Sequence, residues 1–164
     1  MRRANQPTLY LTRGALVAAA YVTLTFLAAL FGLSGGVVQF RISEALCIIP
    51  IFLPEAVLGL TIGCFIANII TGAVIWDVIF GSAATLIGAL GARLLRNLPD
   101  KLIFIATLPT VFANALIVPL ILMFAYGVEG AYWFFFITVA LGEIVCATIG
   151  GTVLYYPLKK LKVK

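Results

Sequence analysis

The distribution of lysine and arginine is the feature that most constrains the fold of this chain. Basic residues form three groups separated by long apolar stretches, and one arginine stands alone at position 41. The groups are Arg2, Arg3 and Arg13; Arg93, Arg96 and Lys101; and Lys159, Lys160, Lys162 and Lys164. Positive charge beside membrane helices stays on the cytoplasmic side. If all three groups are cytoplasmic, an even number of membrane crossings separates each group from the next.

The stretches between the groups predict an all-α integral membrane protein with six transmembrane helices in one compact bundle. Residues 14–92 have room for four crossings and residues 102–157 for two, which places both termini in the cytoplasm and Arg41 outside. We expect one domain over residues 1–164, with spans near 14–33, 43–53, 55–75, 77–96, 102–126 and 131–156. The chain between Arg41 and Trp76 is short for two crossings, so we expect residues 45–53 to be short or tilted.

Composition supports a multi-pass protein of the cell membrane and excludes several other classes. The chain is 63% hydrophobic and 10% charged, with a mean hydropathy of +1.18, so it cannot present an ordinary hydrated surface. It contains no histidine, which excludes histidine-based catalysis and most transition-metal sites. Its three cysteines lie in apolar stretches and predict neither a disulfide framework nor a metal site. The basic residues form short groups beside spans, which indicates membrane orientation rather than nucleic-acid binding.

One carboxylate lies in the middle of the sixth predicted span. Glu143 shares a helical stripe with the small residues Ala140, Ala147 and Gly150, so it is expected to face protein or a cavity. A charge near the centre of a bilayer costs on the order of 2.5–3.5 kcal/mol, so such a group is normally paired, protonated or functional. Glu143 is therefore a candidate binding residue, and a protonated structural glutamate is the alternative.

Asn114 is expected at about the depth of Glu143, and further polar and aromatic residues are expected near the outer ends of the helices. Together they predict a pocket open to the outside for a flat, polar and cationic heterocycle. The candidate residues are Arg41, Glu44, Asn68, Trp76, Asp77, Asn114 and Trp133. Each has a simpler interpretation: an Arg41–Glu44 salt bridge, helix-packing hydrogen bonds by the amides, or tryptophans at the membrane interface.

The segment Gln39-Phe40-Arg41-Ile42-Ser43-Glu44-Ala45-Leu46, followed by Ile49-Pro50 and Leu53-Pro54-Glu55, resembles the signature of the QueT family. The resemblance covers nearly the whole chain and includes its size, six spans, cytoplasmic termini and alanine-rich first helix. It implies a substrate-binding S component of an energy-coupling-factor (ECF) transporter. The implied substrate is a 7-deazaguanine precursor of queuosine, either the 7-aminomethyl compound or queuine. A carboxylate would accept the N–H donors of the guanine edge, and another would neutralise the aminomethyl cation.

The resemblance also implies partners and a docking face. An S component works with a transmembrane coupling protein and two cytoplasmic ATPase subunits, and this chain carries no phosphate-binding loop of its own. The family's small-xxx-small coupling motif matches Ala15 and Ala19, and Gly14 and Ala18 form a second register on the adjoining face. Packing within the chain is the alternative use of these residues. We expect no enzyme activity, no cofactor and no metal.

Three other functions remain open at the level of sequence. An S component for another vitamin, such as thiamine, would have the same architecture and a different pocket. A proton-coupled exporter of small cations would use Glu143 as the exchanging carboxylate and would need no ATPase. A membrane-embedded enzyme has the least support, because the chain shows no nucleophile or metal site in a polar setting.

Overall fold

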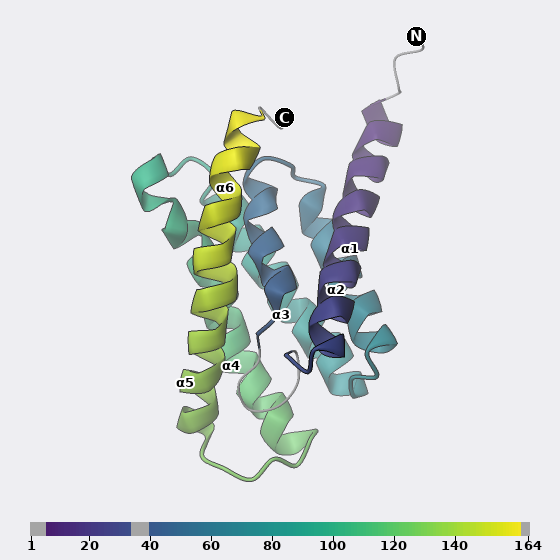
Figure 1. Ribbon diagram of the computed structural model, residues 1–164, viewed down its shortest axis with the longest axis vertical. Coiled ribbons are helices and arrows are strands. Elements are labelled where there is room, and N and C mark those ends of the chain that lie inside the picture. The colour runs from purple at the N-terminus through teal and green to yellow at the C-terminus, as the bar shows by residue number, and fades with distance from the viewer. Residues whose placement is uncertain (1–5, 34–39, 162–164) are drawn as a thin grey trace.

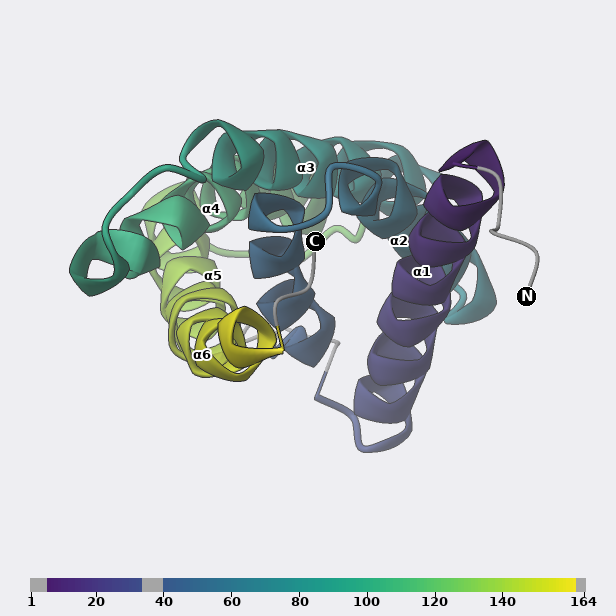
Figure 2. The same cartoon turned by 90° about the horizontal axis from the view of Figure 1, so that it is seen from above.

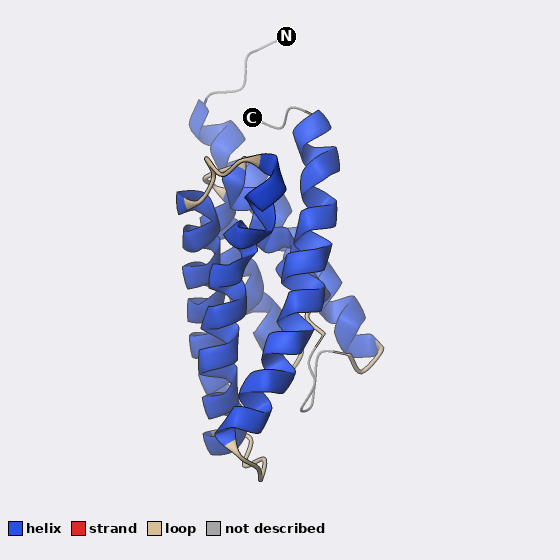
Figure 3. Ribbon diagram, turned by 90° about the vertical axis from the view of Figure 1, so that its left-hand side faces the viewer, coloured by secondary structure: helices blue, strands red, loops and turns tan. Residues whose placement is uncertain are grey.

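The described part of the chain folds as a bundle of six helices. The computed structural model describes residues 6–33 and 40–161, and all regular elements in these ranges are helical (Figure 3). Arg2, Arg3, Lys162, Lys164 and residues 34–39 of the predicted first outer loop lie outside the described residues. Among the described residues, four helices are long and apolar enough to cross a membrane. They are α1 (Gln6–Leu30), α3 (Ile75–Leu94), the continuous helix of η2 (Asp100–Thr107) and α4 (Leu108–Phe124), and the continuous helix of α5 (Tyr132–Glu143), η3 (Ile144–Gly150) and α6 (Gly151–Lys160).

Two shorter apolar helices, η1 (Ile42–Ile51) and α2 (Ala56–Ile70), lie between α1 and α3. The expectation that the second predicted span is short is confirmed, because η1 is a ten-residue 3₁₀ helix. The predicted third span over 55–75 is too long, since α2 ends at Ile70. Gly72 ends it with a left-handed φ of 74°, and the Ala73 N–H donates back to the Asn68 carbonyl at 2.9 Å. This is the helix termination that glycine favours.

The start of α1 and the end of α6 lie at the same end of the bundle (Figure 1). Basic side chains connect separate segments at this end. Arg13 lies 3.6 Å from Glu55, Arg93 donates to the carbonyls of Pro50 and Ile51 at 3.1 Å each, and Lys159 pairs with Asp100. One member of each basic group thus forms an ion pair or a hydrogen bond with another segment. Arg41 lies at the other end of η1 from Arg93.

η1 occupies the centre of the bundle (Figure 2). It packs against α1, α3, η3 and α6, and seven of its ten residues are buried. Glycines make the close approach of the last helix to η1 possible. A methyl group on Gly150 would lie 3.1 Å from Ala45 Cβ, and one on Gly151 would lie 3.4 Å from the Ala45 carbonyl oxygen. The π-helical segment η3, which begins directly after Glu143, contains Gly150 at its end.

The contact between α1 and α2 also depends on small residues. A methyl group on Gly59 would lie 2.5 Å from the Gly14 carbonyl oxygen, and one on Gly63 would lie 3.0 Å from that of Ala18. Gly59 and Gly63 therefore give α2 a packing face within the chain. The outside of the bundle is apolar, since many large hydrophobic side chains on all four long helices are exposed. Such a surface suits the hydrocarbon interior of a membrane.

We predict that Gly59→Ala lowers the stability of the detergent-purified protein by about 1–3 kcal/mol, because the added methyl group meets backbone that cannot move aside. Thermal unfolding measures the change. Gly14→Ala is the matched control on the facing helix, since its methyl group would lie 3.4 Å from the Glu55 carbonyl oxygen, an ordinary contact. Equal stability of the two variants would contradict this account of the α1–α2 contact.

Candidate functional site

A group of buried polar side chains lies inside the apolar bundle. It gathers residues of the start of η1, the end of α2, the start of α3, the interior of α4 and the end of α5. Its members with charged or amide side chains are Arg41, Glu44, Asn68, Asp77, Asn114 and Glu143, all at most 7% exposed. Six of the eight predicted pocket residues are therefore buried. Polar groups at such positions need partners from the protein or from a ligand.

Arg41 pairs with Asp77 at the beginning of α3. Its Nη2 lies 3.3 Å from each carboxylate oxygen of Asp77, and both side chains are 7% exposed. The Tyr126 hydroxyl donates to Asp77 Oδ2 at 3.3 Å and accepts from the Val74 N–H at the same distance. The Asn68 amide donates to the Asp77 carbonyl at 3.1 Å. The network joins η1, α2 and α3 to Tyr126, two residues after α4. Arg41 thus pairs with Asp77 and not with Glu44, the partner of the simpler interpretation.

Gly81, one helical turn after Asp77, leaves the room that this network needs. A methyl group there would lie 2.8 Å from Asp77 Oδ1, 3.1 Å from Asn68 Nδ2 and 3.6 Å from Arg41 Nη1. The absence of a side chain at Gly81 therefore allows the guanidinium group to reach α3.

Glu44 forms a second polar centre, deeper in the bundle. It is completely buried, and its Oε1 accepts a short hydrogen bond from the Tyr21 hydroxyl of α1. Its Oε2 accepts from the Cys47 thiol at 3.0 Å, and the Thr85 hydroxyl of α3 lies 3.4 Å from Oε1. Thr85 also donates to the Gly81 carbonyl at 3.2 Å, so its proton is shared. Glu44 thus connects η1 to both α1 and α3.

Three buried oxygens on α4 and α5 have no hydrogen-bond partner among the residues that the structure describes. They are Oε2 of Glu143, Oδ1 of Asn114 and the hydroxyl oxygen of Thr110. Glu143 is 3% exposed, as its stripe of small residues predicts, and Asn114 and Thr110 are completely buried. The segment η1, which contains Glu44, packs against η3, which begins directly after Glu143. Unfilled acceptors in an apolar interior are costly, and a ligand with N–H donors would satisfy them.

The two predicted tryptophans lie outside this group. Trp76 is 53% exposed and stacks on Phe80 with ring centroids 5.9 Å apart, and Trp133 is 69% exposed and packs edge-on against Phe136. Trp76 lines an apolar groove of about 500 Å³ between α3 and α4 on the outside of the bundle. The structure therefore brings neither indole ring to the buried polar groups.

Sequence reasoning missed several side chains that complete the polar centres. They are Tyr21, Cys47, Thr85, Thr110 and Tyr126. Cys47 follows Glu44 by three residues, which puts the two on one side of a helix and could have suggested their contact. The other four are neutral residues in apolar stretches, and they gain their roles only through contacts with distant segments. Within residues 6–33 and 40–161, no cluster of three or more metal-ligating side chains is present.

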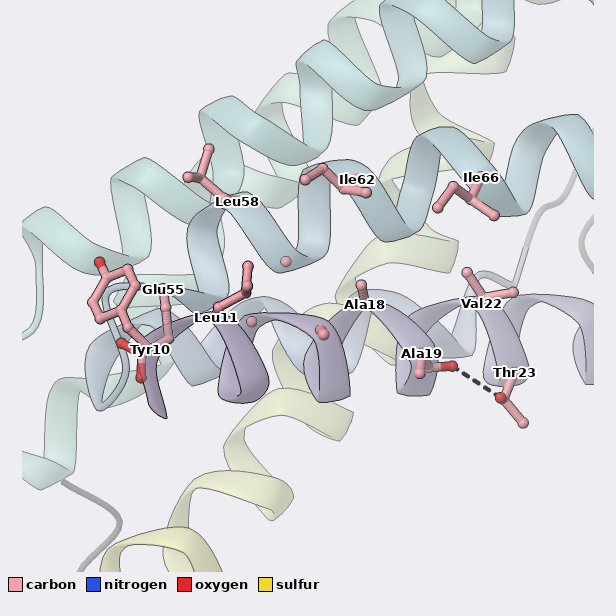
Figure 4. A pocket seen from close by; sticks show the side chains of 13 residues that line it. Tyr10, Leu11, Ala18, Ala19, Val22, Thr23, Glu55, Leu58, Ile62 and Ile66 are labelled. Atoms are coloured by element: carbon pink, nitrogen blue, oxygen red, sulfur yellow. Dashed lines mark hydrogen bonds between the residues drawn. The ribbon is translucent and has the colours of Figure 1, made fainter. Parts of the chain in front are cut away.

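A groove runs along the outside of the bundle between α1 and α2 (Figure 4). We call it the α1–α2 groove. It has a volume of about 610 Å³, and its wall includes Leu58, Ile62 and Ile66 of α2. Ala15 and Ala19 line it and are exposed. Gly14 and Ala18 also line it, but they are partly buried because their backbone packs against Gly59 and Gly63.

Comparisons with known proteins agree with the resemblance found in the sequence. The family described as QueT transporter matches residues 11–160, which is nearly the whole chain. The chain is 32% identical over 147 residues to the Queuosine precursor transporter QueT of Lactococcus lactis subsp. cremoris (strain MG1363), covering 85% of this chain and 86% of that protein. No solved structure gives a significant match. The chain belongs to the QueT transporter family.

Proposed function

We propose that this protein is the substrate-binding S component of an ECF transporter in the cell membrane, and that it captures a queuosine precursor from outside. Membership of the QueT family and the name of the Lactococcus relative support the substrate class. The six helices of the described residues, with basic residues of three groups at one end, support an even number of crossings and cytoplasmic termini.

The unpartnered oxygens of Glu143, Asn114 and Thr110 are the observation that carries this proposal. They come from α4 and α5, which pack against each other. The guanine edge of a 7-deazaguanine carries adjacent N–H donors, and a carboxylate is the strongest acceptor for such a pair. The aminomethyl compound adds a cation, which a buried region rich in carboxylates would favour. We place the base beside Glu143 and Asn114.

Arg41 is proposed to contact the same ligand from the outer side. One of its nitrogens is used by Asp77, and a guanidinium group has five N–H donors, so donors remain for a carbonyl oxygen of the base. Both oxygens of Asp77 already have partners in Arg41 and Tyr126. We therefore propose that Asp77, together with Asn68 and Tyr126, positions Arg41. Glu44 is proposed to hold η1 in place through its contacts with α1 and α3.

Energy for uptake is proposed to come from a transmembrane coupling protein and two cytoplasmic ATPase subunits. The α1–α2 groove supports this assignment, because exposed Ala15 and Ala19 leave room for close approach of another helix. Gly14 and Ala18 contribute indirectly, since they hold α1 against α2 and so shape the groove.

We predict that a 7-deazaguanine precursor stabilises the purified protein against heat, whereas thiamine does not, because a ligand that binds only the folded state raises its apparent stability. Glu143→Gln should weaken this binding by roughly 1.5–3 kcal/mol, the range for a hydrogen bond to a charged group. Ligand titrations followed by thermal unfolding measure both effects, with queuine, the aminomethyl compound, guanine and thiamine as ligands. Glu129→Gln is the control, since Glu129 is an exposed residue in the connection after α4. Unchanged affinity in a folded Glu143→Gln protein would remove Glu143 from the site.

We predict that Arg41→Ala and Asp77→Ala each destabilise the protein by about 3–5 kcal/mol, since each leaves one buried charge without its partner. The double variant should lose less than the sum, because it removes both charges. Measured ligand affinity distinguishes a role of Arg41 in binding from a role in stability. Arg41→Ala and the double variant should both bind the ligand poorly, because both lack the guanidinium group. Normal affinity in a folded double variant would make the pair purely structural.

We predict that Ala15→Leu or Ala19→Leu reduces uptake in cells at least about tenfold, because a branched side chain would fill the groove that the coupling protein enters. Ligand binding to the isolated protein should remain normal, because both alanines point away from the buried polar groups. Ala20→Leu is the matched control, being exposed on α1 but outside the groove. Uptake that continues without the ATPases and follows a pH gradient would instead favour the proton-coupled exporter.

A further inference from the structure

The α1–α2 groove has one carboxylate among its lining residues, and that residue is Glu55. Glu55 directly precedes α2 and lies beside Tyr10 and Leu11 at one end of the groove (Figure 4). It is only 4% exposed, although the groove itself is open at the surface. Apart from Glu55, the wall is formed almost entirely by aliphatic and small residues.

The hydrogen-bonding capacity of Glu55 is incompletely used within the chain. Its Oε1 lies 3.6 Å from Arg13 Nη1, close enough for attraction but too far for a hydrogen bond, and this oxygen accepts none. The side chain does not cap α2 either, since it makes no hydrogen bond to the first turn of that helix. Arg13 is 34% exposed, so its guanidinium group stays partly hydrated beside the groove. Within residues 6–33 and 40–161, the carboxylate of Glu55 is thus left short of hydrogen-bond donors.

This carboxylate restricts what can cover the groove. A purely apolar helix would remove the small exposure that Glu55 retains and leave its carboxylate short of hydrogen bonds, which is costly. A helix with a cationic side chain at this level would supply a charge-assisted hydrogen bond, the strongest kind available to a carboxylate. A lipid chain offers no donor for this carboxylate.

We propose that Glu55 is the polar anchor of the α1–α2 groove, and that the occupant is an apolar helix of the coupling protein carrying a lysine or arginine that donates to the Glu55 carboxylate. This inference rests on the proposed docking of the coupling protein and adds the chemistry that the partner must present. Small residues permit close packing at several positions along a helix, whereas one buried polar pair selects a single register. Glu55 therefore determines where along α1 and α2 the partner helix lies.

The test uses the full transporter, with this chain, the coupling protein and both ATPases produced together and purified through a tag on one ATPase. The amount of this chain retained is compared for Glu55→Gln, Glu55→Lys and Arg13→Gln. Glu129→Gln and Glu129→Lys are matched controls that make the same charge changes at an exposed position. Thermal stabilisation of each isolated variant by the aminomethyl deazaguanine shows whether it is folded.

We expect Glu55→Lys to reduce retention at least about tenfold and Glu55→Gln to reduce it less, because the first opposes the partner's charge and the second only removes the attraction. Arg13→Gln and both Glu129 variants should be retained like the original chain. Normal retention of Glu55→Lys would overturn the proposal, as would normal retention of Glu55→Gln, which can still accept from a neutral donor.

Two other outcomes have distinct meanings. Equal loss in Arg13→Gln and Glu55→Gln, or loss of ligand stabilisation in both Glu55 variants, would show that Glu55 serves the fold of this chain and would also overturn the proposal. Failure of the unaltered chain to purify with the coupling protein and the ATPases would instead contradict the proposed function itself.

Discussion

A polar group inside a membrane protein must find a partner, since lipid supplies none, and this requirement determines how η1 is held. Both ends of the segment are bound by α3. At the start, Arg41 reaches Asp77; at the end, Arg93 donates to the carbonyls of Pro50 and Ile51, which the end of a short helix leaves free. The distance between Asp77 and Arg93 along α3 thus matches the length of η1. A ten-residue 3₁₀ helix, about 20 Å long, can therefore lie stably at the centre of the bundle.

The position of η1 connects the interior polar groups to α1. Tyr21 donates to Glu44, and Thr25 donates to Ser43 at 2.8 Å, so two side chains of α1 bind η1 directly. The other side of α1 lines the α1–α2 groove. One helix therefore carries both the contacts to the proposed ligand region and the proposed docking surface. The contact of α1 with α2, through Gly14 and Gly59, fixes the position of one of these surfaces relative to the other.

Much of the fold could be predicted because the membrane determines where basic residues and apolar segments can lie. The grouping of basic residues predicted six helices, and the crowded stretch after Arg41 predicted the short η1. The stripe around Glu143 predicted its burial. The partner of Arg41 could not be predicted in this way. The three-residue spacing in the sequence allowed a pair with Glu44. Arg41 instead pairs with Asp77, because Gly81 has no side chain that would occupy the space between the guanidinium group and α3.

The sequence alone therefore determined the number of helices, their approximate extents and which polar residues must avoid lipid. Each of these depends on the composition of one segment and the membrane around it. The tertiary structure decided the pairings: Arg41 with Asp77, Glu44 with Tyr21, and both tryptophans away from the buried polar groups. It also separated Gly14 and Ala18, which pack on α2, from Ala15 and Ala19, which remain exposed. These outcomes depend on the rotation and depth of helices that are distant in the chain, and no local pattern specifies either quantity.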